Sequence, residues 1–383
     1  MGKSIEELRK SIDEIDNRIV KDIADRMDVA AEIAAYKKEH GLPTLDPRRE
    51  REKLASIASM AREDIRPYYH VLYTLLFELS RSYQNEINGS NSDKFEEIRR
   101  AIEETPKMFP KAADVACQGV EGAYSSIACE KIFAAPNIQY FNSFEGVFNA
   151  VEKGFCQYGI LPIENSTAGS VKQVYDLMLQ HHFYIVRSTR IKINHCLVAK
   201  PGTDIKNIME IVSHEQALSQ CEEYIKNLSA DIKITPAENT AMAAQLVAGS
   251  DRNDIAAISS YRCAELYGLK TLETNIADSG NNHTRFICIS KKPEIYPGAD
   301  KTSLMVVLSH RPGALYKMLA RFYALGINLQ KLESRPIPER DFEFMFYFDL
   351  DTSIYSDEFV QLICDVNDCC EEFQYLGSYN EVI

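Results

Sequence analysis

The 383-residue sequence lacks any apolar run of about 18 residues, the shortest that predicts a membrane-spanning helix, and its first residues are charged from Lys3 onward. A secretory signal needs an uncharged apolar segment near its start, so we expect neither a signal nor a membrane span. The net charge of −13 is offset by no basic stripe, which argues against nucleic acid or a membrane surface as a partner. These absences together predict a cytoplasmic protein.

The sequence also lacks the usual signs of a metal or nucleotide site. Its ten cysteines show no C-x-x-C spacing, which is typical of reduced core thiols instead of disulfides or a zinc site. No carboxylate or cysteine stands at metal spacing from His181, His182 or His195, so we interpret these as surface or satisfied core histidines. A dinucleotide fingerprint, a P-loop and a Ser-His-Asp order are absent as well. We expect no metal and no cofactor.

The first of three segments, residues 1–88, has the periodicity of long helices. Between Ser4 and Lys38 apolar residues recur every three or four positions without proline or glycine, which predicts one continuous helix. A second helix is expected from Pro47 and a third after Pro67. A helix of some 35 residues is about 50 Å long, too long for two shorter helices to cover. We therefore expect an all-α, intertwined helical dimer domain.

The other two segments mix strands and helices. Residues 89–110 are polar and charged and predict a linker. Residues 111–292 alternate short apolar runs with helical patterns, which predicts a two-lobed α/β domain with ligands at strand ends or between lobes. Residues 300–383 have the order strand, helix, strand, strand, helix, strand of a ferredoxin-like βαββαβ domain. The predicted fold class is multidomain.

Eight polar side chains stand on the expected helices. Arg26 and Lys37 are 11 residues apart in the sequence, which returns them to within about 20° of one helix face, so they can bind one small polyanion. Arg9 lies roughly 100° away around the same helix and has to serve a site built with another subunit. The full set is Arg9, Arg26, Lys37, Asp46, Arg49, Glu50, Ser80 and Gln84.

This set closely resembles the all-helical chorismate mutase family. The resemblance implies a pericyclic rearrangement, which needs a compact substrate conformer and stabilised charge on the breaking ether oxygen. The alternative is a solvated, charged helical dimer without activity. The implied roles are carboxylate binding by Arg26 and by Arg9 of the partner subunit, hydrogen bonding to the ether oxygen by Lys37 and Gln84, contact with the ring hydroxyl and neighbouring cations by Asp46 and Glu50, and substrate orientation by Arg49 and Ser80.

Four motifs in residues 111–292 carry a second resemblance. They are Gln118–Ser125, Leu161–Gly169, Ser213–Gln216 and Asn282–Phe286. They resemble prephenate dehydratase, which implies loss of water and carbon dioxide without a nucleophile, a metal or a redox cofactor. The implied site residues are Thr284 as donor to the leaving hydroxyl, Arg285 as a structural or charge-compensating neighbour, Glu164, Asn165 and Gln216 as polar site residues, and Ser125, Ser166 and Thr167 as carboxylate contacts.

Two of these dehydratase roles have an alternative. A threonine hydroxyl has a poor pKa for a general acid, so Thr284 can serve by orienting the leaving group while electrostatics lower the barrier. For Glu164 and Asn165, the alternative is a loop cap or a buried hydrogen-bonded pair.

The last segment carries a third resemblance. Arg311–Leu315, Gly326–Leu329 and Glu333–Pro336 resemble the ACT module of phenylalanine-regulated dehydratases, although Tyr316 stands where valine is common. The resemblance implies feedback inhibition by L-phenylalanine, and the alternative is a dimerisation domain without ligand. The implied effector residues are Gly313, Ala314 and Leu315 in a loop that the effector approaches, Asn328 and Leu329 from the neighbouring subunit, and Glu333 and Ser334, which shape the pocket.

In order along the chain, the three resemblances are those of the bifunctional chorismate mutase–prephenate dehydratase family. They imply chorismate and prephenate as substrates and a homodimer or higher homo-oligomer. Two alternatives stay open. One is a dehydratase that prefers arogenate, and the other is an amino-acid-sensing protein whose catalytic segments have decayed.

Overall fold

The structure is a computed structural model that describes residues 3–88, 93–229, 231–337, 340 and 343–383. Residues 89–92, which begin the expected linker, lie outside this description. The chain divides into two compact units, described separately below. The first comprises Met1–Arg99, Val306–Gln330 and Leu350–Phe373, and the second comprises Arg100–Met305, Lys331–Asp349 and Gln374–Ile383.

Three long helices form the start of the first unit, as the periodicity predicts: α1 (Ile5–Glu39), α2 (Pro47–Met60) and α3 (Arg66–Asn88), with a short turn η1 (Glu63–Ile65) before α3. Ser4 caps α1 in a reciprocal capping box with Glu7. Asp46 caps α2, which begins with proline, the residue best tolerated in a first helical turn. A further helix, α4 (Asp93–Glu104), lies within the expected linker.

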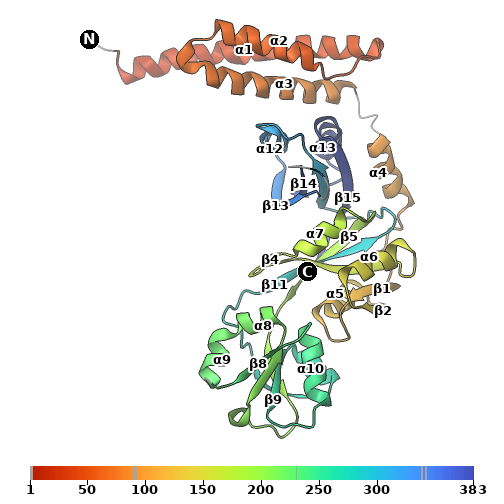
Figure 1. Ribbon diagram of the computed structural model, residues 1–383. Coiled ribbons are helices and arrows are strands. Elements are labelled where there is room, and N and C mark those ends of the chain that lie inside the picture. Colours follow the sequence, from red (N-terminus) through yellow and green to blue (C-terminus); the bar gives the residue numbers. More distant parts are fainter. Residues whose placement is uncertain (1–2, 89–92, 230, 338–339, 341–342) are drawn as a thin grey trace. The chain divides into compact units, whose positions relative to one another are not determined.

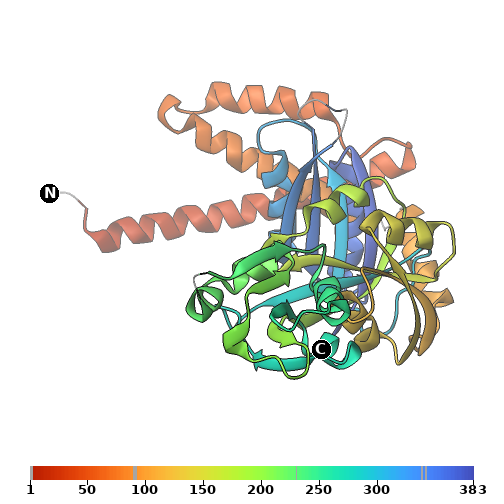
Figure 2. The same ribbon diagram turned by 60° about the horizontal axis from the view of Figure 1, so that its bottom comes forward.

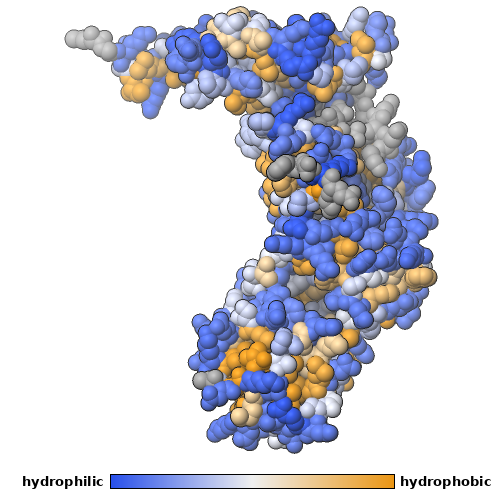
Figure 3. All heavy atoms as spheres, in the orientation of Figure 1, coloured by the Kyte–Doolittle hydropathy of each residue, from blue (hydrophilic) through white to orange (hydrophobic). Residues whose placement is uncertain are grey.

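One side of α1 is largely uncovered. Its buried residues are Ala30 and Ala34, both in its C-terminal half, whereas Leu8, Ile15 and Ile23 are exposed. Figures 1 and 2 both show the N-terminal end of α1 projecting past α2 and α3, and Figure 3 shows apolar patches on the surface of this helical segment. A single chain therefore covers only part of the apolar stripe.

Two sheets form the two lobes of the second unit. The larger has the order β16-β5-β11-β3-β1-β2 with β4 on β3, and the smaller has the order β10-β6-β9-β7-β8. The larger lobe contains β1 (Ala112–Gln118), α5 (Tyr124–Ile132), β2 (Ala135–Phe141), α6 (Phe144–Glu152), β3 (Tyr158–Asn165), β4 (Gly169–Ser170), α7 (Lys172–Met178), β5 (Tyr184–Lys192), β11 (His283–Ser290) and β16 (Glu381–Val382). The smaller lobe contains β6 (Cys196–Ala199), η2 (Ile205–Asn207), β7 (Glu210–Ser213), α8 (Glu215–Gln220), α9 (Glu222–Leu228), β8 (Lys233–Pro236), α10 (Thr240–Gly249), β9 (Ile255–Ser259), α11 (Tyr261–Leu266) and β10 (Lys270–Thr274).

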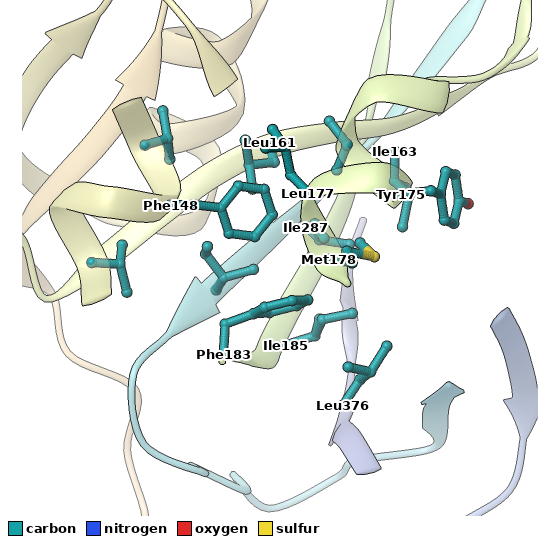
Figure 4. Close-up of a cluster of buried hydrophobic side chains, with 14 of the residues drawn as sticks. Phe148, Leu161, Ile163, Tyr175, Leu177, Met178, Phe183, Ile185, Ile287 and Leu376 are labelled. Carbon is teal, nitrogen blue, oxygen red and sulfur yellow. The ribbon is translucent and has the colours of Figure 1, made fainter. Parts of the chain in front are cut away.

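The core of the larger lobe packs helices α6 and α7 on the sheet. Phe148, Tyr175 and Ile287 are buried there, together with Leu376 from the C-terminal region (Figure 4). Strand β16, which the sequence patterns did not predict, pairs in parallel with β5. The chain thus returns to this lobe at its end.

The C-terminal segment has the expected element order: β12 (Lys301–Val307), α12 (Ala314–Ala324), β13 (Asn328–Pro336), β14 (Phe344–Asp351), α13 (Asp357–Cys369) and β15 (Glu372–Tyr379). Its four strands form one sheet in the order β13-β14-β12-β15, a ferredoxin-like arrangement. Of the described helices, none is long and apolar enough to cross a membrane. The eight cysteines whose side chains are described are all free thiols.

Candidate active sites

Helices α1 and α3 bring Arg26 and Ser80 together. The Arg26 guanidinium donates to the Ser80 hydroxyl and to the Leu76 carbonyl at 3.4 Å, and it lies 5.9 Å from the centre of the Phe77 ring. Burial lowers the pKa of Arg26 below its ordinary value, although an arginine stays protonated near neutral pH. The helices therefore hold a partly desolvated cation beside a hydroxyl group.

Two more predicted residues lie on the same helices. Gln84 stands one turn after Ser80 on α3, and its buried Oε1 accepts no hydrogen bond from any residue that the structure describes. An unsatisfied buried amide oxygen is costly, so this position favours a bound donor. The Lys37 ammonium donates to the Thr44 carbonyl at 2.6 Å. Arg26, Ser80, Lys37 and Gln84 are thus candidates for one anion site.

Glu50 has a partner that the sequence patterns did not indicate. Its carboxylate pairs with Arg81, and Arg81 also pairs with Glu78 at 2.5 Å. Arg81 directly follows Ser80 but points to α2, because neighbouring residues on a helix diverge by about 100°. Glu50 is therefore fixed by an ion pair inside the helical segment.

The remaining predicted mutase residues are exposed. Arg9 lies on the uncovered part of α1, and Arg49 lies in the first turn of α2. Asp46 accepts a hydrogen bond from the Arg49 backbone N–H at 3.0 Å, which accounts for it as a helix cap. A single chain leaves these three groups open to solvent.

The two lobes of the second unit are joined by two neighbouring stretches, 193–195 and 275–282. The Ile193 N–H donates to the Asn282 carbonyl at 2.8 Å, and the Ile276 N–H donates to the His195 carbonyl at 3.1 Å. Outside glycine, Asn275 is the one described residue with positive φ, at 57°, where the second stretch begins. Asn282 of one dehydratase motif lies in the second stretch, and two other motifs bond to the stretches, Ser166 to the Asn281 carbonyl and Tyr124 to the Asn194 carbonyl.

Asn165 is the centre of a hydrogen-bonded network at the junction. Its Oδ1 accepts from the Thr167 N–H at 3.0 Å, the Thr167 hydroxyl at 2.7 Å and the Ala168 N–H at 2.9 Å. Its Nδ2 donates to Asn282 Oδ1 at 2.8 Å and to the Thr284 hydroxyl oxygen at 2.9 Å. Because Thr284 accepts this bond, its own hydroxyl proton is free for another acceptor.

The second lobe contributes Gln220 to this network. Gln220 Oε1 accepts from Asn282 Nδ2 at 2.8 Å, and its Nε2 donates to the Thr167 hydroxyl oxygen at 2.8 Å. The predicted site residue Gln216 lies outside this network: its side chain is exposed, and its backbone N–H donates to His214. Residues four apart share a helix face, so the spacing from Gln216 was a signal that could have drawn attention to Gln220.

Glu164 and Arg285 are held by partners other than this network. Neighbouring residues of a strand point to opposite sides of the sheet, so these two face away from Asn165 and Thr284. Arg285 pairs with the buried Asp349 at 2.5 Å and donates to the Tyr379 hydroxyl at 2.9 Å. Glu164 pairs with Lys331 at 2.8 Å. The expected set of dehydratase residues is thereby divided between two faces.

A cavity of about 850 Å³ opens beside the second face. Its lining includes the predicted residues Glu164, Ser166 and Arg285 and the basic residues Lys131 and Arg190. The Ser166 hydroxyl also donates to the Asn281 carbonyl at 2.8 Å and accepts from the His283 N–H at 2.9 Å. Ser166 is thus engaged by the stretch that joins the lobes.

The glycine-rich loop before α5 packs against the second lobe. Gly122 has φ of +87°, and a Cβ there would lie 3.0 Å from Cys263 Sγ. The Tyr267 hydroxyl donates to the Glu121 carbonyl at 3.0 Å. Ser125 is buried in the first turn of α5. This loop therefore holds the two lobes together, in addition to any role in binding a carboxylate.

The expected effector residues are also divided by strand alternation. Gly313 starts α12 with φ of +83°, and Ala314 and Leu315 behind it are half-buried. On β13, Leu329 and Glu333 lie on the half-buried face, whereas Asn328 and Ser334 lie on the exposed face. The carboxylate of Glu333 accepts from the Ser170 hydroxyl at 2.6 Å, and the Asn328 amide donates to Asp351 at 2.8 Å. Each has a partner within its own unit.

The partly buried cations of the helical segment and the hydrogen-bonded groups between the lobes are typical of a multidomain enzyme that binds small anions through fixed charges and hydrogen bonds. The family model described as "Prephenate dehydratase" matches residues 115–294, and the model described as "Chorismate mutase type II" matches residues 8–85. The chain is 30% identical over 97% of its length to a "Bifunctional chorismate mutase/prephenate dehydratase" of Enterobacter agglomerans, of which it covers 95%.

Two further comparisons agree. The chain is 33% identical to an "Arogenate dehydratase/prephenate dehydratase 2, chloroplastic" of Arabidopsis thaliana, over 80% of this chain and 87% of the relative. A solved prephenate dehydratase from Arthrobacter aurescens, in complex with L-Phe, is 27% identical with a TM-score of 0.65 and covers 70% of this chain and 90% of its own. The chain belongs to the bifunctional chorismate mutase–prephenate dehydratase family, with a helical chorismate mutase domain followed by a prephenate dehydratase domain.

Proposed function

We propose that the helical domain, residues 1–88, rearranges chorismate to prephenate. The reaction breaks an ether C–O bond and forms a C–C bond within one molecule, so a protein accelerates it by selecting the compact conformer and stabilising charge on the ether oxygen. Arg26, beside Ser80, is the cation that binds a carboxylate. Lys37 and Gln84 bind the ether oxygen, while Glu50, Asp46 and Arg49 order the groups around the ring.

The mutase site is completed by a second copy of the chain. The exposed apolar residues Leu8, Ile15 and Ile23 on α1 support this, because water exposure of such a stripe is unfavourable and a second α1 of the same pattern covers it. Arg9 lies on this uncovered part and reaches the site of the partner subunit. The smallest assembly is then a homodimer.

A subunit-mixing experiment tests the shared site. Arg9→Ala and Arg26→Ala chains should each lose mutase activity, whereas a random mixture should recover about a quarter of the wild-type rate, because a mixed two-fold dimer has one intact site. If exchange is shown by mass and no activity returns, the two arginines do not serve one composite site.

The two-lobed domain, residues 111–292, converts prephenate to phenylpyruvate. The C–C bond to the ring carboxylate breaks and releases carbon dioxide, its electron pair enters the ring, and the ring C–O bond breaks to release hydroxide, which takes up one proton and leaves as water. The Thr284 hydroxyl donates a hydrogen bond to the departing oxygen and keeps its proton, while the proton that completes the water molecule comes from solvent. Asn165 holds the Thr284 hydroxyl in place. Aromatisation supplies the driving force.

The single observation that carries this proposal is the direction of the hydrogen bond at Thr284, whose hydroxyl oxygen accepts from Asn165 and whose proton can therefore be donated to the substrate. The test is to give the purified chain chorismate and to follow the loss of chorismate and the appearance of phenylpyruvate. Conversion to phenylpyruvate is expected. Accumulation of prephenate would contradict the role of Thr284, and unchanged chorismate would favour the amino-acid-sensing alternative.

The C-terminal domain, residues 300–383, binds L-phenylalanine and lowers the dehydratase rate. The L-Phe complex of the Arthrobacter aurescens prephenate dehydratase supports this, as does the left-handed Gly313 that precedes α12. Two ion pairs within the second unit, Lys331 with Glu164 and Asp349 with Arg285, provide a route from the regulatory strands to the dehydratase strands. Phenylalanine then acts by binding the less active arrangement more tightly.

Saturating phenylalanine should therefore reduce the rate of phenylpyruvate formation from prephenate. The oligomer mass, measured by light scattering, shows whether the less active arrangement is also a different assembly. D-Phenylalanine is the matched control. An unchanged rate and an unchanged mass would remove the effector from the proposal.

Arogenate is the second candidate substrate. Its support is the name of the Arabidopsis thaliana relative, which gives both activities. The mutase domain in the same chain favours prephenate, because it makes that compound. Competition between equal concentrations of prephenate and arogenate distinguishes the two.

A further inference from the structure

His195 ends the first of the two stretches that join the lobes and is buried, with 2% of its surface exposed. Its Nε2 lies 2.9 Å from Gln220 Oε1. Its Nδ1 is buried without a hydrogen-bond partner among the described residues, so this histidine is not the fully satisfied core residue that the sequence suggests. Burial lowers the pKa of His195, while the bond to Gln220 opposes that shift.

The direction of each hydrogen bond near His195 can be traced from two backbone groups. The N–H groups of Thr167 and Ala168 can only donate, and both point to one terminal atom of the Asn165 amide. That atom is therefore the oxygen. The Asn165 nitrogen must then face the other way, toward Asn282 and Thr284.

The same reasoning continues across the junction. Since the Asn165 nitrogen donates to the Asn282 oxygen, the Asn282 nitrogen is the atom that faces Gln220. The facing atom of Gln220 must then be its oxygen, which only accepts. His195 approaches this same oxygen with Nε2, so Nε2 has to carry a proton.

The imidazole is thereby fixed as the neutral Nε2–H form. A proton on Nδ1 as well would place a charged donor in a buried position that offers no acceptor among the described residues. Neutral His195 lies at one end of this network, and the backbone N–H groups of Thr167 and Ala168 lie at the other. The Thr284 hydroxyl oxygen accepts within the network, so its own proton can be donated to a group outside it.

We infer that His195 is a positioning residue for the dehydratase reaction: its Nε2–H holds Gln220 against Asn282 and so keeps the Thr284 hydroxyl pointed at the substrate. The inference rests on the proposed dehydratase site. His195 does not touch the substrate. It acts through Gln220, Asn282 and Asn165, and it ties the second lobe to the strand that carries Thr284.

Loss of the imidazole N–H would weaken this arrangement at a defined place. Gln220 would keep its bonds to Asn282 and Thr167, but its oxygen would lose one of two donors, and α8 would lose this bond to the stretch 193–195. Misplacement of a reacting group by about 1 Å costs roughly 100-fold in rate. The effect should fall on the chemical step more than on substrate binding.

The experiment compares His195→Leu with His195→Gln in the full-length chain. We expect His195→Leu to lower kcat for prephenate by about 10- to 100-fold, with KM changed by less than about threefold. His195→Gln places an N–H near the position of Nε2 and should recover most of that loss. An unchanged kcat in His195→Leu would overturn the inference, and so would a loss in His195→Leu that His195→Gln does not recover.

Two controls separate this effect from a folding defect. His181 bonds to Glu152 at 2.8 Å and stacks on Phe148, away from the network, so His181→Leu should leave kcat unchanged. The chorismate mutase rate of each variant reports whether the rest of the chain is intact. If wild-type protein itself fails to convert prephenate, the proposed function fails, which differs from failure of the role of His195.

A second measurement reads the tautomer of His195 in the wild-type protein itself. Nitrogen chemical shifts of ¹⁵N-histidine-labelled wild-type protein report the tautomer, and the His195 signals are identified by their absence from the His195→Gln spectrum. The Nε2–H form at pH 7 is expected. An Nδ1–H form or an imidazolium would overturn the inference, because the traced network allows neither.

Discussion

The sites around Arg26 and Thr284 differ in how much of the site one chain supplies. Around Arg26, the helices leave Arg9, Asp46 and Arg49 exposed and α1 half-covered. Around Thr284, two lobes of the same chain meet, and the polar groups bond to one another across the junction. A helix can bury its apolar face only on another element, whereas a two-lobed fold encloses its own site. The comparison teaches that the mutase should depend on assembly and the dehydratase on internal hydrogen bonding.

Breaking the dimer should produce the largest difference between the two activities. Ile15→Asp places a charge on the exposed apolar stripe of α1, where burial against a second α1 would be costly. Mutase activity should fall below detection, while the dehydratase rate stays within about twofold. Sedimentation and both assays check this. Glu14→Ala, at the adjacent exposed position, is the control, and a dimeric or mutase-active Ile15→Asp chain would count against the assembly proposal.

Removing the Thr284 hydroxyl should have the opposite effect on the two activities: the dehydratase rate should fall and the mutase rate should stay the same. Thr284→Val keeps the shape and removes the donor, and loss of one such donor typically costs about 100- to 1,000-fold in kcat. The mutase rate should not change. Thr284→Ser, which keeps the hydroxyl, should retain most of the activity. A fast Thr284→Val enzyme would show that another group assists the departure of the hydroxyl.

Removing Asp349, the ion-pair partner of the buried Arg285, should lower the free energy of unfolding more than it lowers either activity. Asp349→Ala leaves a buried guanidinium without its carboxylate, which typically costs about 3–5 kcal/mol. Differential scanning calorimetry should show earlier unfolding for this variant. Asp351→Ala, two residues along the same strand and at a less buried position, is the control. Equal unfolding temperatures for the two variants would show that Arg285 finds another partner.

The smallest effect concerns the pH dependence of the helical segment. Arg81 and Arg321 outweigh the cost of burial and lower the pKa of Glu78 to about 2, from an ordinary value of 4.5. The folded state therefore binds this proton less readily, so the stabilisation is complete above pH 4.5 and is lost as the pH falls toward 2. Its upper limit is about 3 kcal/mol. Glu78→Gln should flatten the unfolding free energy between these pH values, and an unchanged slope would assign the dependence to other carboxylates.

The sequence was a good guide wherever the signal was local. The apolar repeat predicted α1, and Pro47 and Pro67 marked the starts of α2 and α3 to within a residue or so. The motifs around Asn165 and Thr284 were recognised from short runs of residues, and the structure brings the two side by side. These features depend on periodicity and on short runs of residues, both of which can be read from the amino-acid sequence alone.

Other parts of the sites depended on strand pairing. Thr284 pairs with Asn165 and Arg285 with Glu164, across 119 and 121 residues of sequence. Because side chains alternate along paired strands, Thr284 and Asn165 lie on the face of the hydrogen-bonded network. Arg285 and Glu164 lie on the opposite face, where they pair with Asp349 and Lys331. No local pattern identifies those two partners, because both stand on strands of the C-terminal sheet. The sequence did not single out Gln220 for a related reason, since only the docked lobe shows which turn of α8 faces Asn282.

By itself, the sequence determined the order of the segments, the long helices, the element order of the C-terminal domain and the residue types that each reaction requires. Local backbone preferences and apolar periodicity decide these features, and they do not need distant residues. The tertiary structure alone decided which face each side chain occupies, which buried charges pair, and that His195, Gln220 and Asn282 connect to Thr284. Those features arise from contacts between residues far apart in the chain, where only packing and the direction of hydrogen bonds select one arrangement.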